Sequence, residues 1–196
     1  MRLFLAISIS SKFRGFITNV QKKLTEFDKT LTWVKPSQAH ITLRFLGDQP
    51  EEKLIAIIRY SKDIVAVAPE FELGDMDFKL FPNSKNPRAL LFDFQEGKKE
   101  FLDLQKRLDE SLLKSGLIFK HPLVFPHLTI GRIKEKASPS QRQAVVLRLS
   151  DALAKPRRFR KVDLAVKVQK IHLIQSQLTP KGPIYRGLES FSLVSV

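Results

Sequence analysis

HITL at residues 40–43 and HLTI at residues 127–130 follow one pattern, His-x-Thr-x with aliphatic residues at both x positions. The chain has only four histidines in 196 residues. Two histidines followed by threonine at this spacing would arise by accident in about one comparable sequence in a hundred. We therefore interpret the two stretches as one functional element that occurs twice.

Each stretch lies in an apolar run typical of a β-strand, in which successive side chains point to opposite faces. This alternation predicts that His40, Thr42 and Arg44 share one face of the first strand. It likewise predicts that His127 and Thr129 share one face of the second. A histidine and a threonine about 7 Å apart on such a face can both reach a small tetrahedral anion. The imidazole can exchange a proton, and the hydroxyl can donate a hydrogen bond.

A pair of histidines suits the cleavage of a phosphodiester. Near neutral pH an imidazole populates both charge states, so one ring can take a proton from water while the other gives one to the leaving oxygen. No metal is needed where the ester is already activated, as a strained 2′,3′-cyclic phosphate is. The residues alone leave open which histidine is the acid and which is the base.

Composition narrows the function classes. The absence of cysteine excludes a disulfide framework, a thiol nucleophile and a Cys-ligated metal or iron–sulfur cluster. The excess of 34 Lys and Arg over 20 Asp and Glu gives a net charge of +14, which favours a polyanionic partner, above all nucleic acid. The alternative is a basic surface that is merely solvated, and the same choice applies to the cluster KPRRFRK at 155–161.

The N-terminus MRLFLAISIS has a single basic residue and a short apolar run, and polar residues follow it where a signal peptide would have a cleavage site. The longest apolar runs are far shorter than the roughly 18–20 residues that a membrane helix needs. We therefore predict a cytoplasmic protein with no membrane partner.

Strands and helices are predicted to alternate along the chain, without low-complexity tracts. The predicted strands are 3–10, 40–47, 71–82, 88–94, 125–132 and a strand or strand pair over 159–176. The first predicted helix has Ser11 as its N-cap, and further helices are predicted to begin at residues 48–50, at Gly97 and at residues 138–139. Because the second half repeats the plan of the first, we expect two similar α+β lobes, each with one His-x-Thr strand, within a single domain over residues 1–196.

Five stretches occur in an order that resembles a known family. They are RLFLAI (2–7), WVKPSQAHITLRFLGD (33–48), PRALLF (87–92), FPHLTIGR (125–132) and SQLTPKGPIYRGLESFSL (176–193). Together they resemble the 2H phosphoesterases, and within these the RNA 2′,3′-cyclic phosphodiesterases, formerly called 2′-5′ RNA ligases.

The resemblance implies a bilobal, pseudo-twofold α+β fold in which two antiparallel sheets line a central cleft and the helices lie outside. It implies that His40 is the proton donor and His127 the proton acceptor, with Thr42 and Thr129 on the phosphate and a 2′-phosphomonoester as product. Formation of 2′-5′ linkages, the reverse chemistry, is a secondary implication. We expect a monomer that uses no cofactor and no metal, and that acts on RNA with a 2′,3′-cyclic phosphate end or on a cyclic nucleotide.

Two arginines are candidates for substrate binding. Arg44 follows the first motif on the predicted face of His40, and Arg132 fits the family's pattern after the second motif. Strict alternation would point Arg132 away from His127, so its contact with a phosphate requires a twist or bulge. Tyr185, in the stretch GPIY, has two open interpretations, packing and substrate contact.

Two other function classes compete with the phosphodiesterase. A catalytically silent, basic RNA-binding protein would fit the charge, but the two intact motifs argue against it. A two-histidine metal hydrolase is disfavoured because neither an HExxH nor an HxH motif lies on these strands.

Overall fold

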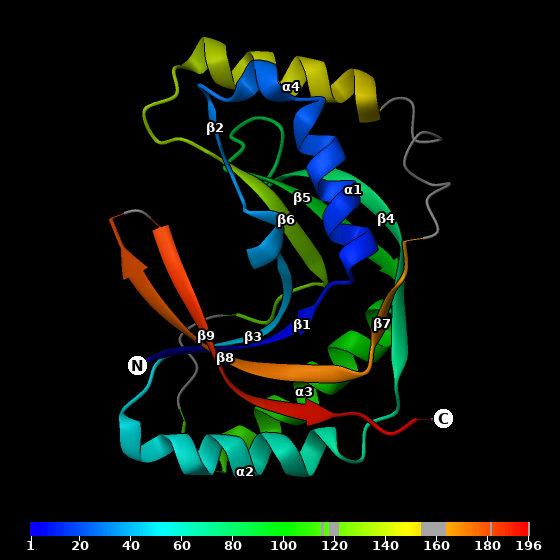
Figure 1. The fold of residues 1–196 in the computed structure, drawn as a ribbon, viewed down its shortest axis with the longest axis vertical. Helices are drawn as coiled ribbons and strands as arrows, with labels where there is room; N and C mark the ends of the chain where they lie inside the picture. The colour runs from blue at the N-terminus through cyan, green and yellow to red at the C-terminus, as the bar shows by residue number, and fades with distance from the viewer. Residues whose placement is uncertain (115, 118–121, 154–163, 181, 196) are drawn as a thin grey trace.

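The structure is a computed structural model that describes residues 1–114, 116–117, 122–153, 164–180 and 182–195 (Figure 1). The strands of this part are β1 (Arg2–Ser8), β2 (Leu31–Trp33), β3 (His40–Asp48), β4 (Phe71–Phe81), β5 (Ala89–Glu96), β6 (His127–Ile133), β7 (Val166–Val168), β8 (Lys170–Thr179) and β9 (Gly182–Ser192). The helices are α1 (Ser11–Lys22), α2 (Leu54–Val65), α3 (Lys98–Leu113) and α4 (Pro139–Leu153). Short 3₁₀ turns lie at Thr25–Phe27, Pro36–Gln38 and Glu51–Lys53.

The strands form one curled antiparallel sheet in the order β7-β4-β5-β6-β3-β1-β8-β9, and β2 pairs with β6 as well (Figure 1). Its two halves meet between β3 and β6, which are joined through a single residue pair, Ile41 and Leu128. The predicted architecture, antiparallel α+β with helices outside, is confirmed. The two predicted sheets are continuous through this pair.

The helices are exchanged between the two halves of the sheet. Helix α1 follows β1, yet the ring of its Phe13 lies 6.1 Å from that of Phe94 on β5. Helix α3 follows β5, yet its Asp109 forms an ion pair with Arg44 on β3. Helix α3 lies beside α2 below the sheet in Figure 1, and α1 crosses the opposite half. Each half therefore needs a helix from the other part of the sequence to cover its core.

Apolar residues on the helix-covered face of the sheet hold the motif strands in register. Ile41 and Leu128 are both fully buried, as are their strand neighbours Leu43 and Ile130. Burying one such side chain contributes about 1.5–3 kcal/mol. Because a slip of one residue would move the whole apolar set to the other face, this core fixes which side chains are left on the inner face, opposite the helices.

Some details of the predicted elements were wrong. The N-cap of α1 is Ser10, whose Oγ accepts a hydrogen bond from the Phe13 N–H at 3.2 Å, so the cap lies one residue before the predicted Ser11. The strand expected over 159–176 is the pair β7 and β8, and residues 159–163 lie outside the described residues. Strands β2 and β9 were not predicted, because β2 is three residues long and β9 contains two glycines and a proline, which are poor strand formers.

Candidate active site

The two motifs come together at the junction of the two half-sheets. Ile41 and Leu128, the residues between His and Thr in each motif, form the pair that joins β3 to β6. Their side chains point into the core, so by the alternation of the strands His40, Thr42, His127 and Thr129 surround the same point on the inner face. The structure therefore brings together the four residues that the sequence predicted, although 87 positions separate the two histidines.

Both imidazoles are held in the same way. The Nδ1 of His40 lies 2.8 Å from the carbonyl oxygen of Gln38, and the Nδ1 of His127 lies 2.8 Å from that of Phe125. A carbonyl oxygen can only accept, so each Nδ1 carries the proton and donates it. Each Nε2 is then the nitrogen left to exchange a proton with a bound molecule.

His40 lies among aromatic rings. Its ring centroid is 4.9 Å from that of Phe4 and 5.2 Å from that of Tyr185, which meets it edge-on at 89°. Burial lowers the pKa of His40, and the charges of Arg132 and His127 lower it further. Tyr185 reaches the site from β9, and a hydrogen bond from the Gln38 amide to the Pro183 carbonyl (3.2 Å) ties that strand to the segment before His40.

His127 has a carboxylate beside it. Its partner across the ladder is Asp93 on β5, whereas the partner of His40 is Ser8. Burial lowers the pKa of His127, and the charge of Asp93 acts in the opposite direction. Asp93 is buried; its Oδ2 accepts hydrogen bonds from Lys79 Nζ and from Gln95 Nε2 (3.0 Å). The Oδ1 of Asp93 is buried without a hydrogen-bond partner in the described part of the chain.

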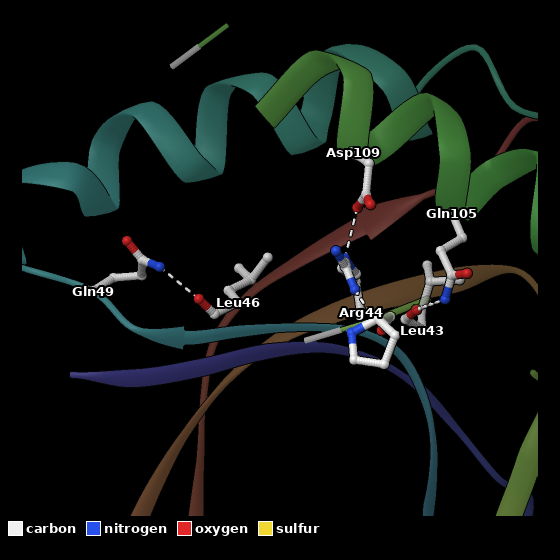
Figure 2. Close-up of polar contacts among 7 residues, drawn as sticks. Leu43, Arg44, Leu46, Gln49, Gln105 and Asp109 are labelled. Carbon is white, nitrogen blue, oxygen red and sulfur yellow. Dashed lines mark hydrogen bonds and ion pairs between the residues drawn. The ribbon is translucent and has the colours of Figure 1, made fainter. Parts of the chain in front are cut away.

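The predicted position of Arg44 is wrong, because β3 has a β-bulge at Leu43. Leu5 pairs with Arg44 and Ala6 pairs with Thr42, so Leu43 is an extra residue and inverts the alternation after it. Arg44 is 2% exposed and points towards α3 (Figure 2). Its Nε donates to Asp109 (2.7 Å) and its Nη1 to the Pro122 carbonyl (2.8 Å), away from the motif histidines.

A matching bulge in β6 has the opposite consequence. Leu90 pairs with Gly131 and Leu91 with Thr129, so Ile130 is the extra residue. The bulge inverts the alternation and places Arg132 on the inner face, where it is exposed. This is the bulge that a phosphate contact of Arg132 was expected to require. The Arg132 charge lowers the pKa of both motif histidines and opposes the rise that burial causes in the pKa of Tyr185.

Comparison with known proteins identifies the family. The family model described as "LigT like Phosphoesterase" matches residues 7–91 and 94–185. The chain belongs to this phosphoesterase family. It is 31% identical to the RNA 2′,3′-cyclic phosphodiesterase of Methanothermobacter thermautotrophicus over 98% of this chain and 99% of that protein. It is 35% identical to the protein of the same name from Aquifex aeolicus, with 82% of this chain and 81% of the other covered.

Solved structures share the fold. The protein TT0787 of Thermus thermophilus superposes with a TM-score of 0.77 at 26% identity, covering 98% of each chain. Escherichia coli LigT complexed with 3′-AMP superposes with a TM-score of 0.73 at 20% identity, covering 98% of this chain and 97% of the other.

The sequence did not single out two residues that this phosphoesterase places around the histidines. Phe4 lies in a uniformly apolar strand, which gave no signal. Asp93 did carry a signal in the sequence, because it is the lone charged residue in the apolar run ALLFDF of 89–94. Tyr185 had been left with two interpretations, and its contact with His40 places it at the site.

The chain has two further histidines and a basic cluster outside the motifs. His172 on β8 shares a hydrogen bond of 2.8 Å with Ser190. His121 and the cluster at 155–161 lie outside the described residues. Within the described ranges, no group of three or more His, Asp and Glu side chains could hold a metal ion. No helix there is long and apolar enough to cross a membrane.

Proposed function

We propose that this phosphoesterase hydrolyses the 2′,3′-cyclic phosphate end of RNA, or a cyclic nucleotide, to a 2′-phosphomonoester by two-histidine acid–base catalysis without a metal. The observation that carries the proposal is the pair of imidazoles, each fixed through Nδ1 and each with a threonine beside it on one face. The names of the curated relatives, RNA 2′,3′-cyclic phosphodiesterase, support the substrate class. The 3′-AMP complex of LigT supports a nucleotide ligand.

In the proposed reaction, water attacks the phosphorus and the bond to the 3′-oxygen breaks. His127 accepts the proton of the water, and protonated His40 donates a proton to the 3′-oxygen. The surroundings favour this direction, because Asp93 stabilises the imidazolium that forms at His127. His40 has Ser8 and no carboxylate as its ladder partner, so no such charge holds the proton on its imidazole.

In the proposed reaction, the other side chains of the inner face stabilise the negative charge that develops on the phosphate. The hydroxyls of Thr42 and Thr129 would donate to the non-bridging oxygens, and the guanidinium of Arg132 would stabilise their negative charge. Arg44 is no longer a candidate for this role, because its guanidinium is buried against Asp109 and the Pro122 carbonyl.

We also propose that residues 1–196 act as one bilobal domain and as a monomer. The exchange of α1 and α3 between the half-sheets supports a single domain. The origin of both motifs in one chain supports a monomer. The net charge of +14 supports RNA as the partner. A cytoplasmic location and reversible 2′-5′ ligation complete the proposal.

The test is incubation with adenosine 2′,3′-cyclic phosphate in excess EDTA, with the product identified by chromatography against 2′-AMP and 3′-AMP. We expect 2′-AMP at the same rate with and without EDTA. RNA binding without turnover would support the catalytically silent alternative. Loss of activity in EDTA that zinc restores would support the metal hydrolase, and 3′-AMP as product would contradict the proposed leaving group.

A further inference from the structure

A glutamine amide meets the extra residue of each motif bulge. The Nε2 of Gln105 on α3 donates to the carbonyl of Leu43 at 2.5 Å (Figure 2). The Nε2 of Gln21 on α1 donates to the carbonyl of Ile130 at 3.1 Å. These carbonyls belong to the two residues that directly follow Thr42 and Thr129.

The two glutamines also match in sequence. Gln21 lies in VQKKL (20–24) and Gln105 in LQKRL (104–108), and the residues at both ends of each stretch are buried. Each glutamine stands four residues after a fully buried apolar residue, Ile17 or Phe101, so it lies on the stripe of the helix that faces the sheet. The two glutamines therefore match in their sequence context, in the helix face on which they lie and in their contact with a bulge.

Packing alone does not explain the amide of Gln105. Gln105 is fully buried, and its Oε1 has no hydrogen-bond partner in the described part of the chain. Burying an unpartnered amide oxygen costs free energy that a leucine or methionine would avoid. What the amide supplies is a donor for a carbonyl at a point where the bulge disrupts the ladder.

The same need is met at a second bulge of β3. Leu3 pairs with Gly47 and Phe4 with Phe45, so Leu46 is an extra residue too. Its carbonyl accepts from the Nε2 of Gln49 at 2.5 Å (Figure 2). Glutamine amides thus donate to the bulge carbonyls of both motif strands, and the carbonyl of Ile130 also accepts from the Val34 N–H.

We propose that Gln21 and Gln105 are positioning residues that hold the two motif bulges, and that Gln21 thereby directs Arg132 towards the phosphate. The role of Arg132 rests on the proposed function. Gln21 also donates to the Val34 carbonyl at 2.8 Å, and the Val34 N–H donates to Ile130 at 3.0 Å, so the end of β2 and the bulge of β6 are tied together. Gln105 holds the corresponding bulge of β3, after which the inner-face residue is the uncharged Phe45.

The difference between Arg132 and Phe45 makes the proposal testable. Among the residues that the structure describes, the charged and titratable groups that face the motif histidines are Asp93 of β5, Arg132 of β6 and Tyr185 of β9, with Lys79 of β4 bonded to Asp93. Loss of the Gln21 amide should release Arg132 and remove its lowering effect on both histidines. Loss of the Gln105 amide should leave that charge in place.

The variants Gln21→Met and Gln105→Met keep the side-chain length but lack the donor. For Gln21→Met we expect about a tenfold fall in kcat for adenosine 2′,3′-cyclic phosphate with little change in KM, and a shift of the kcat/KM profile to higher pH. For Gln105→Met we expect an unmoved pH profile. Gln21→Glu, which keeps length and polarity but has no amide N–H, should behave like Gln21→Met and serves if the latter does not fold.

A double variant separates positioning from general damage to the fold. If Gln21 acts through Arg132, adding Gln21→Met to Arg132→Gln should cause no further loss of kcat/KM. Losses that multiply, or a folded Gln21→Met with the wild-type pH profile, would overturn the proposal. In that case Arg132→Gln would still be impaired, and the proposed function would stand.

A readout independent of activity uses Trp33, the single tryptophan of the chain. Trp33 pairs with Gly131, and a Cβ at Gly131 would come within 3.0 Å of its ring, so the indole covers the residue after the bulge. Gln21→Met should shift the Trp33 emission, and Gln105→Met should not. Unchanged emission in Gln21→Met would overturn the inference even if the enzyme proved to have another substrate.

Discussion

The two motif strands, HITLRF (40–45) and HLTIGR (127–132), share a backbone design but differ in what it displays. Both place the histidine, the threonine, a bulge and a glutamine partner at the same positions. The residue after each bulge turns away from the site, as Arg44 and Gly131 do. The next residue turns inwards, and it is Phe45 in one strand and Arg132 in the other.

The comparison shows that a near-symmetric frame surrounds its two histidines asymmetrically, as the proposed reaction requires. The carboxylate of Asp93 and the guanidinium of Arg132 both come from the half-sheet of β5 and β6, whereas the corresponding positions around His40 hold Ser8 and Phe45. Two equal imidazoles thus have unequal electrostatic surroundings. This inequality is what an acid and a base acting in one step require.

The largest effect should come from the residues that the strands share. His40→Ala and His127→Ala should each lower kcat about 10²–10⁴-fold with the fold intact, because each removes one proton transfer. The double variant should lose far less than the product of the two, since both groups act in one step. Steady-state kinetics with adenosine 2′,3′-cyclic phosphate and circular dichroism check this, and near-normal turnover in either single variant would contradict the assignment.

The next effect tests the residue in which the strands differ. Arg132→Gln should lower kcat about 10²–10³-fold, the usual cost of a lost donor to developing negative charge. Because Arg132 lowers the pKa of both histidines, its removal should also raise their pKa values and move the kcat/KM profile to higher pH. Phe45→Ala, the change at the matching position, should leave the profile in place. Equal shifts in the two variants would contradict the proposed difference between Arg132 and Phe45.

The threonines should contribute less and equally. Thr42→Val and Thr129→Val keep a β-branched side chain suited to a strand but remove one hydrogen bond to a charged phosphate oxygen. We expect a loss of about tenfold in kcat/KM for each, without a shift in pH dependence, because the hydroxyls do not titrate in this range. A loss confined to one of the two would show that the strands hold the phosphate unequally.

Asp93→Asn should change pH dependence more than maximal rate. The carboxylate raises the pKa of His127, so its removal should lower that pKa and move the limb of the profile that reports the base to lower pH, opposite to Arg132→Gln. The fitted values belong to the coupled pair of histidines. Ser8→Ala, at the matching position beside His40, is the control and should shift neither limb. A shift to higher pH in Asp93→Asn would refute the role of the carboxylate.

The smallest effect on activity is expected at Arg44. Arg44→Met removes one partner of a buried ion pair, and the loss should cost about 3 kcal/mol of stability, or roughly 6–12 °C in Tm. The kcat/KM of the folded variant should stay within about twofold of wild type, because the bulge turns Arg44 away from the site. Thermal melts and kinetics at 20 °C check both. A large loss of activity with an unchanged Tm would indicate that Arg44 binds the phosphate after all.

The sequence by itself predicted the candidate residues of the site and most of the elements. Period-two alternation placed His and Thr on one face of each motif strand, and helical periodicity located the long helices, because both depend only on local geometry. A recurring motif in a basic chain pointed to the reaction class. These conclusions need no knowledge of how distant segments pack.

Only the tertiary structure decided which arginine reaches the site. In sequence, Arg44 lies four positions after its histidine and Arg132 lies five after its own, so alternation favoured Arg44. One bulge in each strand reversed both assignments. A bulge arises where strands far apart in the chain pair, here β1 with β3 and β5 with β6, and no local pattern reveals it. For the same reason the sequence did not single out Asp93: its neighbour His127 lies 34 residues away and becomes adjacent only when β5 pairs with β6.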